Sequence, residues 1–192
     1  MKLVLASENK GKINEFSKTL STLGIEVCEA KISLPEETGT TYEENAKLKA
    51  RFVYERYNLP TISDDSGLEI EALGGAPGIY SARFAGENKS DKERVEIILK
   101  ELKNVPEEKR MAKLICVICL VENGEEVFFR GEAKGTLAFE PRSTRECWGY
   151  DPVFVAEGGK TFGEISREAK NKISHRGKAI QMLYNYMKKT RT

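Results

Sequence analysis

The chain has 192 residues, 40% of them hydrophobic, and its 31 lysines and arginines nearly balance its 30 aspartates and glutamates. This length is enough for one domain with a sizeable core, and we expect a single domain over residues 1–192. The balanced charge excludes the bulk positive field that non-specific nucleic-acid binding requires. No apolar run reaches the length of a membrane span, and the apolar start, residues 1–6, is too short for a signal peptide. We therefore expect a cytoplasmic protein that binds neither nucleic acid nor membrane.

The first segment predicts a buried strand followed by an amphipathic helix. Residues 2–6 are mostly apolar, and apolar residues then recur at spacings of three and four from Ile13 to Leu23. The polar turn 7–12 between them carries two lysines and the backbone N–H groups of a helix start, which together suit a phosphate. Helix starts that carry lysine are common, so the turn can also be an ordinary connection.

A second helix is predicted from Thr41, because Thr41-Tyr-Glu-Glu44 has the spacing of a capping box. The loop 34–39 in front of it carries Glu36 and Glu37. One of these carboxylates could turn toward the acids that follow the helix, although a solvated turn is the ordinary alternative.

Two adjacent acids, Asp64 and Asp65, come at the end of the strand that Pro60 begins, and four glycines follow between residues 67 and 78. We expect the chain to leave the strand there through a glycine loop that lets a ligand approach the backbone. Adjacent carboxylates repel each other and favour a cation, so the segment predicts a metal-assisted site on a loop. An acidic turn that caps a helix is the alternative.

The rest of the chain predicts a helix, a hairpin and a final helix. Ser90-Asp-Lys-Glu93 is a second capping box. The apolar runs 111–121 and 126–138 flank an Asn-Gly pair, which is typical of a tight β-turn. The last helix is expected over residues 174–187.

The cysteines do not predict a metal or redox site. Cys116 and Cys119 lie in the apolar run 114–121, where residues three apart on a strand point to opposite faces. The chain has one histidine, His175, so a zinc site would lack its usual ligands. We expect buried cysteines that act as small apolar residues.

Two segments suit a nucleotide base. Trp148-Gly-Tyr-Asp151 offers a flat aromatic surface beside a carboxylate, although both rings can also be core residues. His175 and Arg176 follow a capping serine, and Lys170 precedes them, so the three side chains can present hydrogen-bond donors to an acceptor-rich ligand. A helix-leading His-Arg pair is also common on ordinary surfaces.

In this order and spacing, Ser7-Glu-Asn-Lys-Gly-Lys12, Asp64-Asp-Ser-Gly67, Leu73–Arg83, Gly149-Tyr-Asp-Pro152 and Ile173-Ser-His-Arg-Gly177 resemble the inosine triphosphate pyrophosphatase family. The resemblance spans nearly the whole chain. It implies an α/β fold with an elongated mixed β-sheet flanked by helices, two lobes around a central cleft, and a homodimer. It also implies Mg²⁺-dependent hydrolysis of ITP, dITP and XTP to the monophosphate and pyrophosphate, which clears deaminated purines from the nucleotide pool.

The same resemblance assigns residues to this chemistry. Asp65 takes the position of the catalytic acid, as general base or metal ligand, and Glu36 that of the second metal carboxylate, with Glu37 equally placed in the loop. The substrate-binding residues that it implies are Ser7, Glu8, Asn9, Lys10, Gly11, Lys12, Ser66, Trp148, Gly149, Tyr150, Asp151, Lys170, His175 and Arg176.

Donors aimed at O6 of hypoxanthine or xanthine would face the 6-amino group of adenine, so such a pocket rejects ATP. It does not by itself reject GTP, because guanine also carries O6. Two other functions fit parts of the pattern: a pyrophosphatase of related fold that acts on other nucleotides, and a nucleotide-binding module without turnover. The paired acids argue against the binding module, since binding alone does not need them.

Overall fold

The computed structural model describes residues 1–86, 88–145 and 147–190, and the chain divides into two compact units. The first unit comprises Met1–Asp65, Cys116–Gly131 and the chain from Arg176 onward, and the second comprises Ser66–Ile115 and Glu132–His175. In the described residues, no helix is both long enough and apolar enough to cross a bilayer.

The first unit is an α/β structure whose strands follow the order β2-β1-β3-β5-β6. Strand β1 pairs in parallel with both β2 and β3. Its elements are β1 (Lys2–Leu5), α1 (Lys10–Leu20), the 3₁₀ turn η1 (Ser21–Leu23), β2 (Glu26–Glu29), α2 (Tyr42–Tyr57), the first half of β3 (Thr61–Ile70), parts of β5 (Met111–Glu122) and β6 (Glu125–Leu137), and α5 (His175–Thr190) without its first residue.

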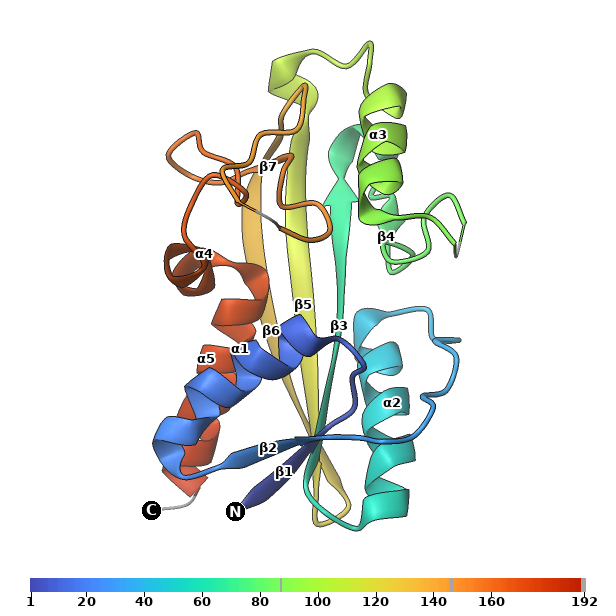
Figure 1. Ribbon diagram of the computed structural model, residues 1–192. Helices are drawn as coiled ribbons and strands as arrows, with labels where there is room; N and C mark the ends of the chain where they lie inside the picture. The colour runs from blue at the N-terminus through green and yellow to red at the C-terminus, as the bar shows by residue number, and fades with distance from the viewer. Residues whose placement is uncertain (87, 146, 191–192) are drawn as a thin grey trace. The chain divides into compact units, whose positions relative to one another are not determined.

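Helices cover both faces of this sheet (Figure 1). Ile62 of β3 packs with Phe16 of α1 and Leu183 of α5 in one buried cluster. The next residue, Ser63, donates a hydrogen bond from its hydroxyl to the Ala46 carbonyl of α2. Because side chains alternate along a strand, the even-numbered residues in the first half of β3 face α1 and α5, and the odd-numbered residues there face α2.

The second unit packs a separate core around the other halves of the long strands. Strand β4 (Pro77–Gly78) pairs antiparallel with β3, and β7 (Phe154–Val155) pairs antiparallel with β6. The sheet is thus mixed, and the mixed α/β fold expected from the sequence is confirmed. The other elements of this unit are η2 (Glu71–Leu73), α3 (Asp91–Glu101), η3 (Glu107–Lys109) and α4 (Arg167–Ile173).

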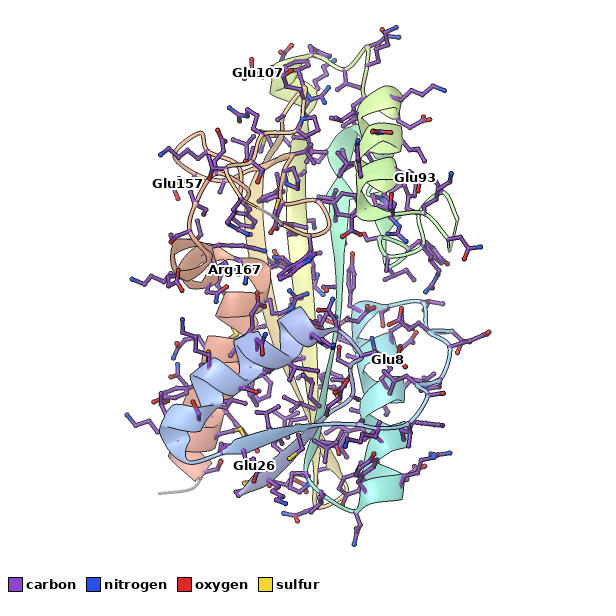
Figure 2. All side chains as sticks on the ribbon, viewed as in Figure 1. Glu8, Glu26, Glu93, Glu107, Glu157 and Arg167 are labelled. Atoms are coloured by element: carbon purple, nitrogen blue, oxygen red, sulfur yellow. The ribbon has the colours of Figure 1, made fainter. Side chains whose placement is uncertain are left out.

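Most local sequence signals produced the expected structure. Ser90 and Glu93 form a complete capping box at the start of α3, and Glu93 lies on that helix in Figure 2. At α2 the Thr41 side chain caps the helix as expected, but Glu44 accepts from the backbone N–H of Thr40, 2.6 Å away. The loop is thereby fastened one residue further upstream than a standard capping box provides.

The hairpin turn is also confirmed, because Asn123 and Gly124 both have positive φ angles, 52° and 80°, as a type I′ turn requires. The short helix α4 was not predicted. Its local signal is Ser166, whose hydroxyl accepts from the Ala169 N–H at 3.1 Å. Ser174, expected as the cap of the last helix, ends α4, and α5 begins at His175.

The expected loop after the paired acids is wrong. Strand β3 runs without interruption from Thr61 to Ile70, so Asp64 and Asp65 lie in the middle of a strand. Gly67 belongs to the sheet, because a Cβ there would lie 2.1 Å from the carbonyl oxygen of Gly78 in β4. The glycine was a signal of close approach between two strands, and not of a loop.

Candidate functional site

The two aspartates of β3 point to opposite faces of the first unit. Asp64 faces α1 and α5, where Lys12 Nζ lies 2.9 Å from its Oδ1 and Arg176 Nε lies 3.2 Å from its Oδ2. Asp65 faces α2, where the Asn45 side chain donates to its Oδ2 at 3.1 Å. The two acids therefore have different side-chain neighbours.

Asp64 is a buried carboxylate held by cations. It is 1% exposed. Burial alone would raise its pKa, but Lys12, Arg176 and Lys49 outweigh this effect and hold the pKa of Asp64 well below its usual range. Arg176 also lies 3.4 Å from Glu15 of α1, and the pKa of its guanidinium is raised although burial opposes this, because Asp64 stabilises the charged form.

Asp65 has the opposite electrostatic environment. Burial raises its pKa, Glu37 adds to this, and Lys49 and Asn45 only partly compensate, so the pKa of Asp65 stands at about 6. A carboxylate with this pKa is mostly ionised at pH 7 and is more basic than an ordinary aspartate, which suits a general base.

Lys49 connects the acid loop to β3. Its ammonium group forms an ion pair with Glu37 and donates to the Asp64 carbonyl oxygen at 2.9 Å. Burial lowers the pKa of Lys49, but Glu37 and the two aspartates raise it by more, so Lys49 stays charged.

The predicted phosphate turn lines a cavity of about 360 Å³ in the first unit, together with the acid loop. Glu8 lies at the start of this turn (Figure 2). The cavity is lined by Ala6, Ser7, Glu8, Asn9, Lys12, Leu34, Pro35, Glu37, Lys49 and Asp64.

The backbone of this turn offers fewer donors than the sequence suggested. The Asn9 side chain caps α1 and accepts from the N–H groups of Gly11 and Lys12, at 2.9 and 3.2 Å. The Asn9 N–H in turn donates to the Ser7 hydroxyl. Asn is a preferred N-cap residue, and here its side chain takes up two of the backbone N–H groups that were expected to bind a phosphate. The cations in the cavity lining are Lys12 and Lys49, which lie there with the acids Glu8, Glu37 and Asp64. Lys10 is exposed at the first position of α1.

The acid loop presents Glu37 to the cavity, whereas Glu36 is exposed. In the described residues no three acidic, histidine or cysteine side chains form a ready ligand set. The donor chemistry still fits Mg²⁺, which commonly takes one or two carboxylates and completes its shell with water and phosphate oxygens. Glu37 raises the pKa of Asp65, and a divalent cation near both would relieve this repulsion.

Cys116 and Cys119 are buried, as expected, whereas Cys28 and Cys147 are partly exposed. Burial raises the pKa of Cys119 to about 12 and raises that of Cys116 further. The Cys116 thiol also lies 3.7 Å from Asp64 Oδ2. It therefore contributes a weak polar contact as well as apolar volume.

The aromatic segment predicted to bind a base lies in the second unit, and its two rings have different environments. Trp148 is 49% exposed, and the Arg167 guanidinium lies 4.8 Å from its ring centroid. Tyr150 is buried in the core of this unit and donates from its hydroxyl to the Ser81 carbonyl at 2.8 Å. Trp148 is thus half exposed with Arg167 over its ring, while Tyr150 anchors the segment.

Three other predicted base contacts in this unit, Gly149, Asp151 and Lys170, are also anchored. Lys170 forms a salt bridge of 2.5 Å with Asp151. Gly149, in the left-handed region with φ 60°, donates from its N–H to Asp91 at 2.7 Å. His175 is buried and Ser66 is partly exposed. Arg176, which the sequence grouped with His175, belongs to the first unit and pairs there with Asp64.

Two functional candidates, Asn45 and Lys49, were not named from the sequence. Glu37 was left open as an alternative to Glu36, and Asp64 was named as one of the paired acids, but not as the counter-ion of Lys12 and Arg176. Asn45 and Lys49 stand four residues apart on α2, and this spacing places both on one face of the helix. That pattern was available in the sequence. Which face turns toward the acids was not.

Fold and site together define an α/β protein in which two lysines line a cavity and the neighbouring strand carries a basic carboxylate, an arrangement that suits the hydrolysis of phosphate esters and anhydrides. The model of the Ham1 family matches residues 3–186. The chain belongs to this family, and the family resemblance inferred from the sequence is confirmed.

Individual relatives resemble this protein over nearly the full length of the chain. The dITP/XTP pyrophosphatase of Yersinia pseudotuberculosis is 44% identical, with 97% of this chain and 98% of that protein covered. The structure of the Staphylococcus aureus Ham1 protein gives a TM-score of 0.89 at 39% identity and covers all of both chains. A HAM1 protein from Coxiella burnetii gives a TM-score of 0.92 at 38% identity, covering 98% of this chain and 99% of that one.

Proposed function

We propose that this protein hydrolyses 6-oxopurine nucleoside triphosphates, ITP, dITP and XTP, to the monophosphate and pyrophosphate. The enzyme class, a nucleoside triphosphate pyrophosphatase, is confirmed by the names of full-length relatives. The observation that carries the proposal is the cavity in which Lys12 and Lys49 lie beside a strand whose Asp65 has a pKa of about 6.

In the proposed reaction, water attacks the α-phosphorus and the bond to the bridging oxygen of pyrophosphate breaks. Asp65 accepts a proton from the water while the water oxygen forms its bond to the α-phosphorus. Pyrophosphate leaves with the electrons of the broken bond. Lys12 and Lys49 stabilise the negative charge of the phosphate oxygens. The pKa of Asp65 suits this step, because the group is ionised at neutral pH and still basic enough to take the proton.

We assign Mg²⁺ to Asp65 together with one acid of the loop, Glu36 as the family resemblance implies or Glu37, which faces the cavity. When bound, the metal would neutralise charge on the triphosphate and polarise the reacting phosphate. Ser7, Glu8, Asn9, Lys10 and Gly11 remain proposed contacts of the triphosphate.

For the base, we propose stacking on Trp148, with Ser66, the segment 149–151, Lys170, His175 and Arg176 as further contacts. The support is the exposed ring of Trp148 beside the salt-bridged Lys170 and Asp151. Donors that recognise O6 would oppose the 6-amino group of adenine, and an unpaired buried donor is costly.

We further propose that the protein acts in the cytoplasm as a homodimer and removes deaminated purine nucleotides before they are used in synthesis. Light scattering of the purified protein tests the dimer, since a monomer would have the chain mass of 21.6 kDa.

The deciding experiment measures pyrophosphate release from ITP, XTP, GTP, ATP and dTTP with and without Mg²⁺. We expect rapid metal-dependent release from ITP and XTP and slow release from the others. Equal rates on all five nucleotides would contradict the proposed base selectivity. Binding of ITP without release of pyrophosphate would instead support a nucleotide-binding module. As a matched pair, Trp148→Phe should keep selectivity, and Trp148→Ala should weaken binding by about 1–3 kcal/mol.

A further inference from the structure

We propose that Asn45 is a positioning residue that fixes the carboxylate of Asp65 and the acid-bearing loop 34–39 to each other. The inference rests on the proposed function, because it concerns how the proposed base and its neighbouring acid are held. Asn45 is fully buried and both ends of its amide are bonded to the protein, so we assign it no contact with substrate.

The side chain of Asn45 is fully buried and bonded at both ends. Its Nδ2 donates to Asp65 Oδ2 at 3.1 Å, and its Oδ1 accepts from the Gly39 N–H at 2.8 Å. The chemistry of the partners permits only this orientation of the amide, because a backbone N–H can only donate and an ionised carboxylate can only accept. No other uncharged side chain of this size provides a donor and an acceptor at the same two places.

The contact with Gly39 is tight enough to exclude a side chain. A Cβ at Gly39 would lie 2.7 Å from Asn45 Oδ1 and 2.7 Å from Glu44 Cβ. The loop backbone therefore packs directly on the first turns of α2. A methyl group at Gly39 would push the Asn45 amide away from Asp65.

A second contact on the same helix face holds the acid of this loop. Lys49, four residues after Asn45, forms an ion pair with Glu37 and donates to the backbone of β3 at Asp64. Asn45 fastens the end of the loop to Asp65, and Lys49 fastens its carboxylate to the same strand. Helix α2 thus sets where both acids lie.

This arrangement predicts a specific kinetic effect. Loss of the Asn45 amide leaves Asp65 without one of its donors and frees the loop, so the base no longer meets its target in the right place. Lys12 is held by Asp64 on the opposite face of β3, so triphosphate binding should change little. The loss should appear in kcat and in metal affinity, and not in the KM for nucleotide.

The test compares Asn45→Leu, which keeps the size but removes both polar groups, with Gly39→Ala, which leaves Asn45 in place but displaces it. Glu44→Gln is the matched control. Glu44 precedes Asn45 on α2 and accepts hydrogen bonds from Thr40, the residue directly after this loop. Steady-state kcat and KM for dITP, Mn²⁺ affinity by electron paramagnetic resonance, and thermal melts are measured for each protein.

We expect Asn45→Leu and Gly39→Ala to lower kcat by about 10- to 100-fold, the scale of a small misplacement of a reacting group. Their KM for dITP should stay within about threefold and their Mn²⁺ affinity should fall, with Glu44→Gln close to wild type. Gly39→Ala carries the test if Asn45→Leu does not fold.

Wild-type kcat and Mn²⁺ affinity in either folded variant would overturn the inference. An equal loss in Glu44→Gln would also overturn it, because loop anchoring in general would then explain the effect. If the wild-type protein releases no pyrophosphate from any nucleotide, the proposed function fails. The Mn²⁺ titration then still decides the inference, because unchanged affinity in both variants would show that Asn45 does not organise the two acids.

Discussion

The two faces of β3 in the first unit place adjacent aspartates in opposite electrostatic states. On the α1 and α5 face, Asp64 is surrounded by cations and its pKa is lowered. On the α2 face, burial and Glu37 raise the pKa of Asp65 to about 6. The comparison shows that burial alone does not decide the state of a carboxylate, since both are buried. Asp64 is stabilised in its ionised form by the cations around it, whereas the ionised form of Asp65 costs stability.

The largest expected effect is on catalysis at Asp65. Asp65→Asn should reduce pyrophosphate release from dITP by about 10²- to 10⁴-fold, the usual contribution of a general base, measured with saturating Mg²⁺. The folded protein should at the same time become more stable. The raised pKa means that the ionised form is disfavoured in the folded state, and removal of this charge is worth up to about 3 kcal/mol at pH 7.

The stability gain should depend on pH in a defined direction. A carboxyl with a raised folded pKa contributes stability below its unfolded pKa and loses it as pH rises through about 6. The melting temperatures of wild type and Asp65→Asn should therefore converge near pH 4. A mutant that is less stable than wild type at pH 7 would show that Asp65 is a structural charge like Asp64.

The next largest effect is the loss of Asp64. Asp64→Asn should lower the free energy of unfolding by about 3–5 kcal/mol, because it leaves the ammonium of Lys12 and the buried part of Arg176 without their shared counter-ion. The lowered pKa means that this contribution is fully present above the unfolded pKa and is lost as pH falls from there through the folded pKa. Urea unfolding at pH 7 and at about pH 2 checks both statements, and a deficit that is equal at the two pH values would contradict them.

A third effect concerns the pH dependence of activity. The value of kcat/KM for dITP should fall about tenfold per pH unit below about pH 6, because Asp65 becomes protonated. A higher Mg²⁺ concentration should move this acid-side fall in kcat/KM to lower pH, since a cation bound to the same carboxylate competes with the proton. If the acid-side fall of kcat/KM instead lay near pH 4 and did not shift with the Mg²⁺ concentration, Asp65 would not be a ligand of the metal.

The smallest effect should come from Cys116. Its thiol touches Asp64 Oδ2 at 3.7 Å, but the two cations dominate that carboxylate. Cys116→Ala should cost about 1 kcal/mol, measured by the same urea unfolding, with the activity unchanged. A loss as large as that of Asp64→Asn would mean that the thiol, and not the ion pairs, holds the acid in place.

The sequence alone determined the secondary structure where a local signal specifies it. The capping box at Ser90 and the Asn-Gly turn at residue 123 were confirmed, because their hydrogen bonds and backbone angles involve residues only a few positions apart. The five sequence motifs, in their order along the chain, were sufficient to identify the family. The short helix α4 was missed because its one cap, Ser166, is a weak signal without a long apolar stripe.

Only the tertiary structure decided how the charged residues are distributed. Gly67 looked like the start of a loop until its close approach to Gly78 placed it inside a strand. Arg176 and Asp64 are 112 positions apart, and no local pattern joins them. The alternation of β3 sends Asp64 and Asp65 to different faces, and the helices that pack on each face supply the neighbours that set the two pKa values. Those neighbours are brought together by long-range packing, whereas caps and turns depend on contacts that a short peptide already contains.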